Sequence, residues 1–246
     1  MIYKFPASIH SSLKHYVYIY IDPRDNQVFY VGKGKGDRAF AHLSDTSEHD
    51  KVVRISEIHK AGLNPIIELV IHGIEDDETV RRIEASIIDI YGLTNLTNIQ
   101  RGYHSREFGR MSIDQILATY APEKVVVTDP VLAFRINKTF HYGMTARELY
   151  DYTRHSWILG DRRNSAKYAF TVYQGVVQEV YEIVAWFPQN STPNIKHEQG
   201  ESTDINSERW EFVGHVAEPT IRDKYLYKNV AKYFLSNQSP YTYINC

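Results

Sequence analysis

The chain has 246 residues, of which 43% are apolar and 24% charged, and its formal net charge is −2. A nearly neutral chain has no overall field that would draw it onto a polyanion, so any phosphate binding must come from local patches. The single cysteine excludes a disulfide framework, and no apolar run approaches the roughly 18 residues of a membrane span, so we expect a cytoplasmic protein without a membrane contact.

Residues 1–104 carry alternating strand and helix signals. Runs of β-branched and aromatic residues predict strands, and a short Asp-Pro-Arg-Asp-Asn turn joins the first two into an antiparallel hairpin. Apolar spacing and closing glycines predict the helices. In chain order we expect strands at 15–22 and 27–32, helices at 37–43 and 48–62, a strand at 65–73 and a helix at 75–92. This β-β-α-α-β-α order predicts a compact α+β domain built on a small antiparallel sheet.

The pattern changes after residue 104. Residues 105–130 form a predicted linker, in which a Ser-x-x-Gln capping box starts a short helix. Residues 131–246 are mostly predicted strands, apart from a polar, breaker-rich segment at 188–208 that we expect to lack fixed structure without substrate. The strand-rich order is similar in outline to PUA-like modules, which read unusual or flipped bases, and this analogy implies a mixed, β-rich domain closed as a small barrel.

Two predicted strands of the first domain each carry a tyrosine, Tyr18 and Tyr30, and a glycine–lysine loop follows the second. The loop's glycines, of which Gly32 is the first, allow the backbone to approach a bulky group closely. Lys33 and Lys35 place cationic ends beside that group. By itself such a loop is typical of a surface turn, and it lacks the spacing of a nucleotide P-loop.

Three further side chains complete a candidate site. Arg38 and His42 are four residues apart in a predicted helix and would share one face of it. Glu84 interrupts the apolar stripe of the helix at 75–92, where a buried carboxylate is costly unless a bound cation or an arginine such as Arg81 relieves it. A carboxylate-held cation, an arginine for the phosphoryl oxygens and a tyrosine base together suit phosphodiester hydrolysis.

These residues carry a resemblance to the GIY-YIG nuclease superfamily over residues 14–104. "YVY" at 16–18 stands where the family has Gly-Ile-Tyr, with Tyr16 in place of the first glycine, and "YVG" at 30–32 stands where it has Tyr-Ile-Gly. The remaining motif residues follow in the family's order as Arg38, His42 and Glu84. The stretch "FYVGKGKGDRAFAHL" is most similar to the branch that includes LEM-domain-type nucleases.

The resemblance implies an endonuclease with one Mg²⁺ or Mn²⁺ ion per active site, bound to Glu84. It implies that Tyr18 is the general base, that His42 supports it, that Tyr30 has a positioning role and that Arg38 stabilises the transition state. These five residues are the predicted catalytic set.

Phosphate contacts are expected from the loop and from the asparagine that follows the glutamate in the family. The predicted phosphate-binding residues are Gly32, Lys33, Lys35 and Asn95, with Asn98 as the other candidate for the asparagine. The expected partner is DNA, and RNA stays open as a substrate. A homodimer is an open alternative to a monomer, because one active site cuts one strand at a time.

The second domain is interpreted as the element that selects the target, which would make the protein a modification-dependent restriction or phage-defence enzyme. A DNA-repair or branched-DNA nuclease is the near alternative, and a non-cleaving nucleic-acid-binding or dimerisation protein is the more distant one. Trp157, Trp186 and Trp210 are candidates for stacking on an extruded base. The competing interpretation is that these three side chains fill the core of the domain.

Overall fold

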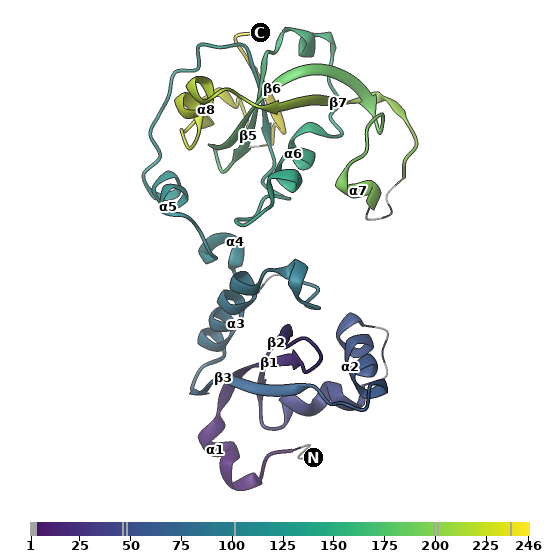
Figure 1. Cartoon of the computed structure of the whole chain (residues 1–246). Coiled ribbons are helices and arrows are strands. Elements are labelled where there is room, and N and C mark those ends of the chain that lie inside the picture. The colour runs from purple at the N-terminus through teal and green to yellow at the C-terminus, as the bar shows by residue number, and fades with distance from the viewer. Residues whose placement is uncertain are drawn as a thin grey trace. The chain divides into compact units, whose positions relative to one another are not determined.

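The computed structural model describes residues 4–45, 47, 49–100, 102–198, 200, 202–236 and 238–246. The chain divides into two compact units, Met1–Arg110 and Met111–Cys246 (Figure 1). The division falls inside the segment 105–130, which is the linker predicted from the sequence. Among the helices of the described residues, none combines the length and the apolar character that crossing a membrane requires.

The first unit is built on a three-stranded antiparallel sheet with the order β2-β1-β3. Its strands are β1 (His15–Asp22), β2 (Gln27–Lys35) and β3 (Ile66–Ile74). The hairpin between β1 and β2 turns at Asn26, which has a φ of 59°. The predicted antiparallel sheet is therefore confirmed, and β2 runs three residues further than expected, into the glycine–lysine loop.

The helices of this unit follow the predicted order, but the first is a 3-10 helix. The longer ones are η2 (Arg38–Ser44), α2 (Asp50–Lys60) and α3 (Asp77–Tyr91). Short turns complete the unit: η1 (Ala7–Ile9), α1 (His10–Leu13), η3 (Leu93–Asn95) and α4 (Ser105–Phe108). Because a 3-10 helix has three residues per turn, residues four apart lie about 120° apart around its axis. The expectation that Arg38 and His42 share one helix face is therefore wrong.

The sheet separates two hydrophobic cores. Alternate residues of β1, among them Tyr16 and Tyr18, pack on one face with Ile58 of α2. Val17 and its alternating neighbours pack on the other face with Ile88 of α3. The two-residue period of a strand thus places α2 and α3 on opposite faces of the sheet (Figure 1).

The second unit contains a five-stranded mixed sheet with the order β7-β6-β5-β4-β8. Its strands are β4 (Val131–Arg135), β5 (Tyr168–Tyr173), β6 (Val176–Gln189), β7 (Asn206–Val216) and β8 (Tyr241–Ile244). Its helices are α5 (Ile113–Tyr120), α6 (Ala146–Arg154), η4 (Asp161–Ser165), α7 (Ile195–Glu198), α8 (Pro219–Tyr225) and η5 (Ala231–Tyr233). A barrel requires the two edge strands to pair. In the described residues β7 and β8 stay at opposite edges, so the predicted barrel closure is not found.

The segment at 188–208 has more structure than its composition suggested. The strand β6 continues to Gln189, and the turn that follows is held by Glu211, whose side chain is fully buried on β7. The Glu211 carboxylate accepts hydrogen bonds from the backbone amides of Asn190 (3.0 Å) and Thr192 (2.8 Å). The expectation of an unstructured loop is therefore wrong for the described part of this segment, which leaves out residues 199 and 201, because a distant strand supplies a buried anchor.

Candidate active site

The candidate site lies along the outer edge of β2, where no further strand of the described residues pairs. The backbone oxygen of Phe29 accepts from the amide (2.7 Å) and the hydroxyl (2.9 Å) of Thr97. The side chain of Asn98 accepts from the amide of Val31 (3.0 Å) and donates to its oxygen (2.7 Å). Residues 97 and 98 thus satisfy the outward-facing backbone groups that an edge strand leaves unpaired.

Glu84 reaches the same edge from α3. Its half-buried carboxylate lies near the backbone amide of Lys33, the next outward-facing position of β2, and that amide opposes the rise of the Glu84 pKa. Burial raises the pKa of Glu84 above its usual value, while the positive charges of Lys33 and Arg81 oppose this shift. Arg81 itself is bound to Asp77 at 2.5 Å. The carboxylate is therefore positioned by the strand edge and is incompletely neutralised by its surroundings.

A cavity of about 380 Å³ opens at this position. Its lining includes Tyr30 of β2, Lys51 of α2, Glu84 of α3 and Asn98. The structure thus brings together two predicted catalytic residues and one of the two asparagine candidates. The other candidate, Asn95, is exposed, and its amide donates to the oxygen of Tyr91 at 2.8 Å.

Tyr18 is buried and is not among the residues that line the cavity. It is 1% exposed and faces Gly32 across the hairpin, where a Cβ on the glycine would lie 2.7 Å from the ring carbon Cζ. The rings of Tyr18 and Tyr30 pack against each other, with centroids 6.0 Å apart. Burial raises the pKa of both phenols, and that of Tyr18 moves far above its usual range. The geometry thus favours Tyr30 over the predicted Tyr18 as the phenol that meets a substrate.

His42 is buried behind Tyr30, with the two rings edge to face at 5.7 Å. Its Nε2 atom accepts from the Nζ atom of Lys51 at 3.2 Å, because an ammonium group can only donate. The ring proton then lies on Nδ1, which faces Asp45 at 3.6 Å. Burial, followed by the charges of Lys51 and Arg38, lowers the pKa of His42. His42 is therefore neutral at pH 7 and orients the lysine beside the phenol.

Lys51 is a residue of the site that was missed from the sequence. Its ammonium lies 4.9 Å from the centre of the Tyr30 ring, and burial together with the charge of Arg38 lowers its pKa. The available signal was its spacing, since Lys51 precedes the buried Ile55 and Ile58 by four and seven positions and so falls on the apolar stripe of α2.

The remaining predicted cations do not belong to the lining of this cavity. Arg38 is exposed, and its charge lowers the pKa values of both Tyr18 and Tyr30, so its guanidinium lies within electrostatic reach of the phenol pair. Lys33 pairs with the carboxylate of Asp77 at 3.2 Å. Lys35 is exposed at the end of β2 and lines a neighbouring surface depression with Arg38. Within the cavity lining the lysine is therefore Lys51, and these three cations act on the site from outside it.

The three tryptophans lie in the second unit, in one hydrophobic cluster with the buried Phe212. Trp186 packs edge to face on Phe212 at 5.6 Å, and the guanidinium of Arg163 covers the ring of Trp210 at 3.4 Å. Trp157 belongs to the same cluster and also lines a separate cavity. All three tryptophans are thus partly buried against this core, and Trp157 also lines a cavity.

The donor set of the site suits a hard divalent cation. In the described part of the chain no group of three or more His, Cys, Asp or Glu residues could hold a metal ion. Glu84 is the one carboxylate among the described residues that line the cavity. Mg²⁺ commonly uses one or two carboxylates together with waters and substrate phosphates, so a single half-buried glutamate with a raised pKa fits such an ion.

Comparisons with known proteins show what the segment that carries this site is similar to. Residues 15–118 match the family model of the LEM-3-like GIY-YIG domain. The chain is 30% identical over 120 residues to the ankyrin repeat and LEM domain-containing protein 1 homolog of Caenorhabditis elegans. The aligned region covers 40% of this chain and 17% of that protein. The chain thus matches less than a fifth of that relative's length, and no solved structure matches it significantly. The matched segment of this chain is a GIY-YIG nuclease-type domain.

Proposed function

We propose that this protein is a metal-dependent endonuclease that hydrolyses phosphodiester bonds of DNA. One observation carries the proposal: Tyr30, Lys51 and Glu84 line a single cavity on a domain of nuclease type. Bringing a phenol, a cation and a carboxylate together from three different elements costs desolvation free energy for each group. Packing alone rarely requires such a cluster, so the cluster indicates a functional site.

In the proposed reaction Tyr30 accepts the proton of the attacking water. The charges of Arg38 and Lys51 stabilise the phenolate that forms, since the Arg38 charge lowers the pKa of Tyr30 and the Lys51 ammonium lies 4.9 Å from the centre of its ring. Arg38 and Lys51 also neutralise charge that develops on the phosphoryl oxygens. Glu84 would hold one Mg²⁺ or Mn²⁺ ion, which supplies charge neutralisation at the scissile phosphate.

The charge of Glu84 connects these roles. Burial is the main cause that raises the pKa of Tyr30, and the negative charge of Glu84 raises it further. A cation bound to Glu84 would offset that negative charge and so would remove one of the causes that raise the pKa of Tyr30.

Nicking of supercoiled plasmid with Mg²⁺ or Mn²⁺ tests the proposal. We expect the wild-type protein to convert supercoiled DNA to open circles, and we expect Glu84→Ala and Arg38→Ala to lose this activity while remaining folded by circular dichroism. A wild-type protein that cuts neither DNA nor RNA with either ion would refute the enzyme proposal and support a non-cleaving binding or dimerisation role.

We further propose that the second unit selects the target and that the protein is a modification-dependent restriction or phage-defence enzyme. Its support is a cavity in that unit whose lining combines cationic and aromatic side chains. Cleavage of hydroxymethylated or glucosylated DNA in preference to unmodified DNA is the expected result. A preference for branched junctions of unmodified sequence would instead favour a repair nuclease.

A double-strand break requires either two copies of the chain or two successive cuts, because each chain offers one such site. We propose a dimer that forms on DNA. Light scattering of the free and DNA-bound protein tests this, with a two-fold increase in protein mass on the DNA expected.

A further inference from the structure

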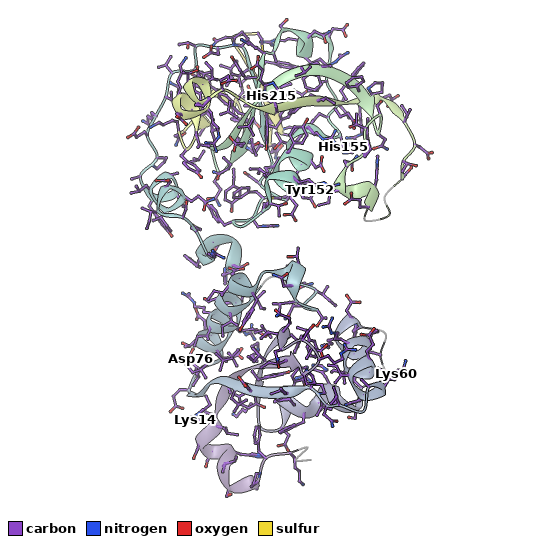
Figure 2. All side chains as sticks on the ribbon, in the orientation of Figure 1. Lys14, Lys60, Asp76, Tyr152, His155 and His215 are labelled. Carbon is purple, nitrogen blue, oxygen red and sulfur yellow. The ribbon has the colours of Figure 1, made fainter. Side chains whose placement is uncertain are left out.

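A second cavity, of about 770 Å³, opens in the second unit. Its walls come from the end of β4, the end of α6, one residue of β7 and the loop before β8, and they comprise residues 135–139, 151–152, 155–157, 209 and 238–240. Figure 2 marks Tyr152 and His155, which lie at the end of α6. A volume of this size lies within the range of small-molecule sites, which is about 300–1,000 Å³.

The charged lining of this cavity favours an anion. Arg135, Lys138 and Arg209 contribute three permanent positive charges. Asp151 is the one carboxylate among the described lining residues, and its oxygens are already taken by the Nε atom of Arg154 (2.8 Å) and by a backbone amide (3.0 Å). The cavity lining therefore has a net positive charge. Its one described carboxylate already accepts hydrogen bonds from Arg154 and from a backbone amide.

Both guanidiniums are held in place before any ligand arrives. Arg135 lies 4.1 Å from the centre of the Phe234 ring and donates to the backbone oxygens of Ser236 (3.1 Å) and Ser239 (3.2 Å). Arg209 donates to the backbone oxygen of Ser156 at 2.9 Å. Ser156 also lines the cavity and has a φ of 81°, a conformation that is costly for a residue with a side chain. Both guanidiniums are thus fixed before a ligand binds, and Arg209 is held by a residue whose backbone conformation is strained.

The aromatic lining adds a fixed flat surface. The ring of Trp157 stacks on the buried Phe134, with centroids 4.7 Å apart and planes inclined by 28°. Its indole N–H donates to the oxygen of Thr153 at 2.8 Å, so neither the ring's position nor its rotation is free. Trp157 is half-buried and borders the cavity beside Tyr152. A ring supported from behind in this way offers a stacking platform for another flat group.

We propose that this cavity binds one nucleotide unit, with its base against Trp157 and its phosphate against Arg135 and Lys138. The nucleotide belongs to a nucleic-acid strand and is extruded from it. A free nucleoside monophosphate would offer the same chemistry to the cavity. The preference for a strand rests on the proposed nuclease function. A charged phosphate beside a flat base matches the pairing of cationic and aromatic walls, which neither a purely apolar ligand nor a bare anion would require.

Binding to short duplexes tests the proposal in the full-length protein carrying Glu84→Gln, so that cleavage does not interfere. One duplex holds a mispaired 2-aminopurine and the other the same base correctly paired; dAMP is the free-nucleotide probe. We expect tighter binding of the mispaired duplex, because an unpaired base costs less to extrude. We expect 2-aminopurine fluorescence to change on binding and Trp157→Ala to weaken that binding by about 5- to 150-fold.

Charge variants provide a readout that a structural role of Trp157 would not move. Lys138→Ala, at an exposed position, should reduce the slope of log affinity against log salt by about 0.9. The matched control Lys167→Ala removes a cation that is 58% exposed and lies outside the cavity lining, and should leave the preference for the mispaired base unchanged. Tyr152→Ala serves as a second aromatic variant if Trp157→Ala fails to fold.

The outcomes separate the two proposals. Equal affinity for both duplexes, unaffected by Trp157→Ala, Tyr152→Ala and Lys138→Ala, overturns the nucleotide cavity. Binding of dAMP with no preference between duplexes assigns the cavity to a free nucleotide and overturns extrusion from a strand. A wild-type protein that never nicks DNA but whose Glu84→Gln form selects the mispaired base through Trp157 supports the cavity and overturns the proposed nuclease function.

Discussion

Replacing Glu84 by glutamine should abolish the proposed nuclease activity and stabilise the first unit. Glutamine keeps the shape of the side chain and an oxygen that can face the amide of Lys33, but it carries no charge. Burial raises the folded-state pKa of Glu84 above its usual value of 4.5. The folded state therefore binds more protons than the unfolded state above that pH, so wild-type stability falls as pH rises from about 4.5 through the folded pKa.

The size of the gain depends on how far burial raises the folded-state pKa of Glu84. For every tenfold weakening of the acid in the folded state, the wild type loses about 1.4 kcal/mol of stability above the folded pKa. In a domain of this size a change of 1 kcal/mol corresponds to roughly 4–8 °C in melting temperature. A divalent cation offsets the stability difference between the wild type and the variant. A ligand at ten times its Kd adds about 1.4 kcal/mol to the stability of the wild type and nothing to that of the variant.

Calorimetry between pH 4 and pH 8, with and without Mg²⁺, measures these differences. Tryptophan fluorescence separates the two units, because all three tryptophans, Trp157, Trp186 and Trp210, lie in the second one. The variant should melt higher than the wild type at pH 8 without metal, equally at pH 4, and without a Mg²⁺ shift at either. A variant that melts lower at pH 8, or that still nicks plasmid, would show that Glu84 is a structural ion-pair partner and not a strained metal ligand.

Three further predictions concern the same site. Gly32→Ala should destabilise the first unit by about 1–3 kcal/mol in urea unfolding, because the added Cβ would overlap the ring of Tyr18. The control Gly160→Ala, where nothing lies within 4 Å of the added Cβ, should change stability by less than about 0.5 kcal/mol. Lys51→Met should raise the pKa of His42 in an NMR titration and slow cleavage about 10- to 100-fold, and an unchanged His42 would refute their contact. Tyr30→Phe should slow plasmid nicking about 10²- to 10⁴-fold with the protein still folded, and full activity would exclude it as the base.

The order of elements in the first unit could be predicted because its signals are local. Asp76 caps α3 by accepting from the amide of Thr79 at 2.7 Å, and Gly92 ends that helix with a φ of 78°. The meeting of Tyr30 and Glu84 could also be predicted, since motif order constrained both. These features depend on residue types at fixed spacing, which a single sequence contains.

The remaining features depend on contacts between distant segments. The role of Lys51 follows from how α2 approaches β2, and the burial of Tyr18 follows from its register opposite Gly32. The segment at 188–208 is polar in sequence, yet Glu211 anchors it from another strand. Such effects arise from desolvation in the folded protein, and local composition does not reveal them.

The outer edge of β2 is covered by side chains and not by another strand. An uncovered edge offers a template for strands of other molecules, which leads to aggregation. Asn98 binds the outward-facing amide and oxygen of Val31, and Glu84 lies near the amide of Lys33, so the groups that form the proposed cutting site also help to keep the sheet from growing. Losing Asn98 or Glu84 would therefore expose the edge of β2 to pairing with strands of other molecules. A related chain without nuclease activity would still need these two side chains for this reason.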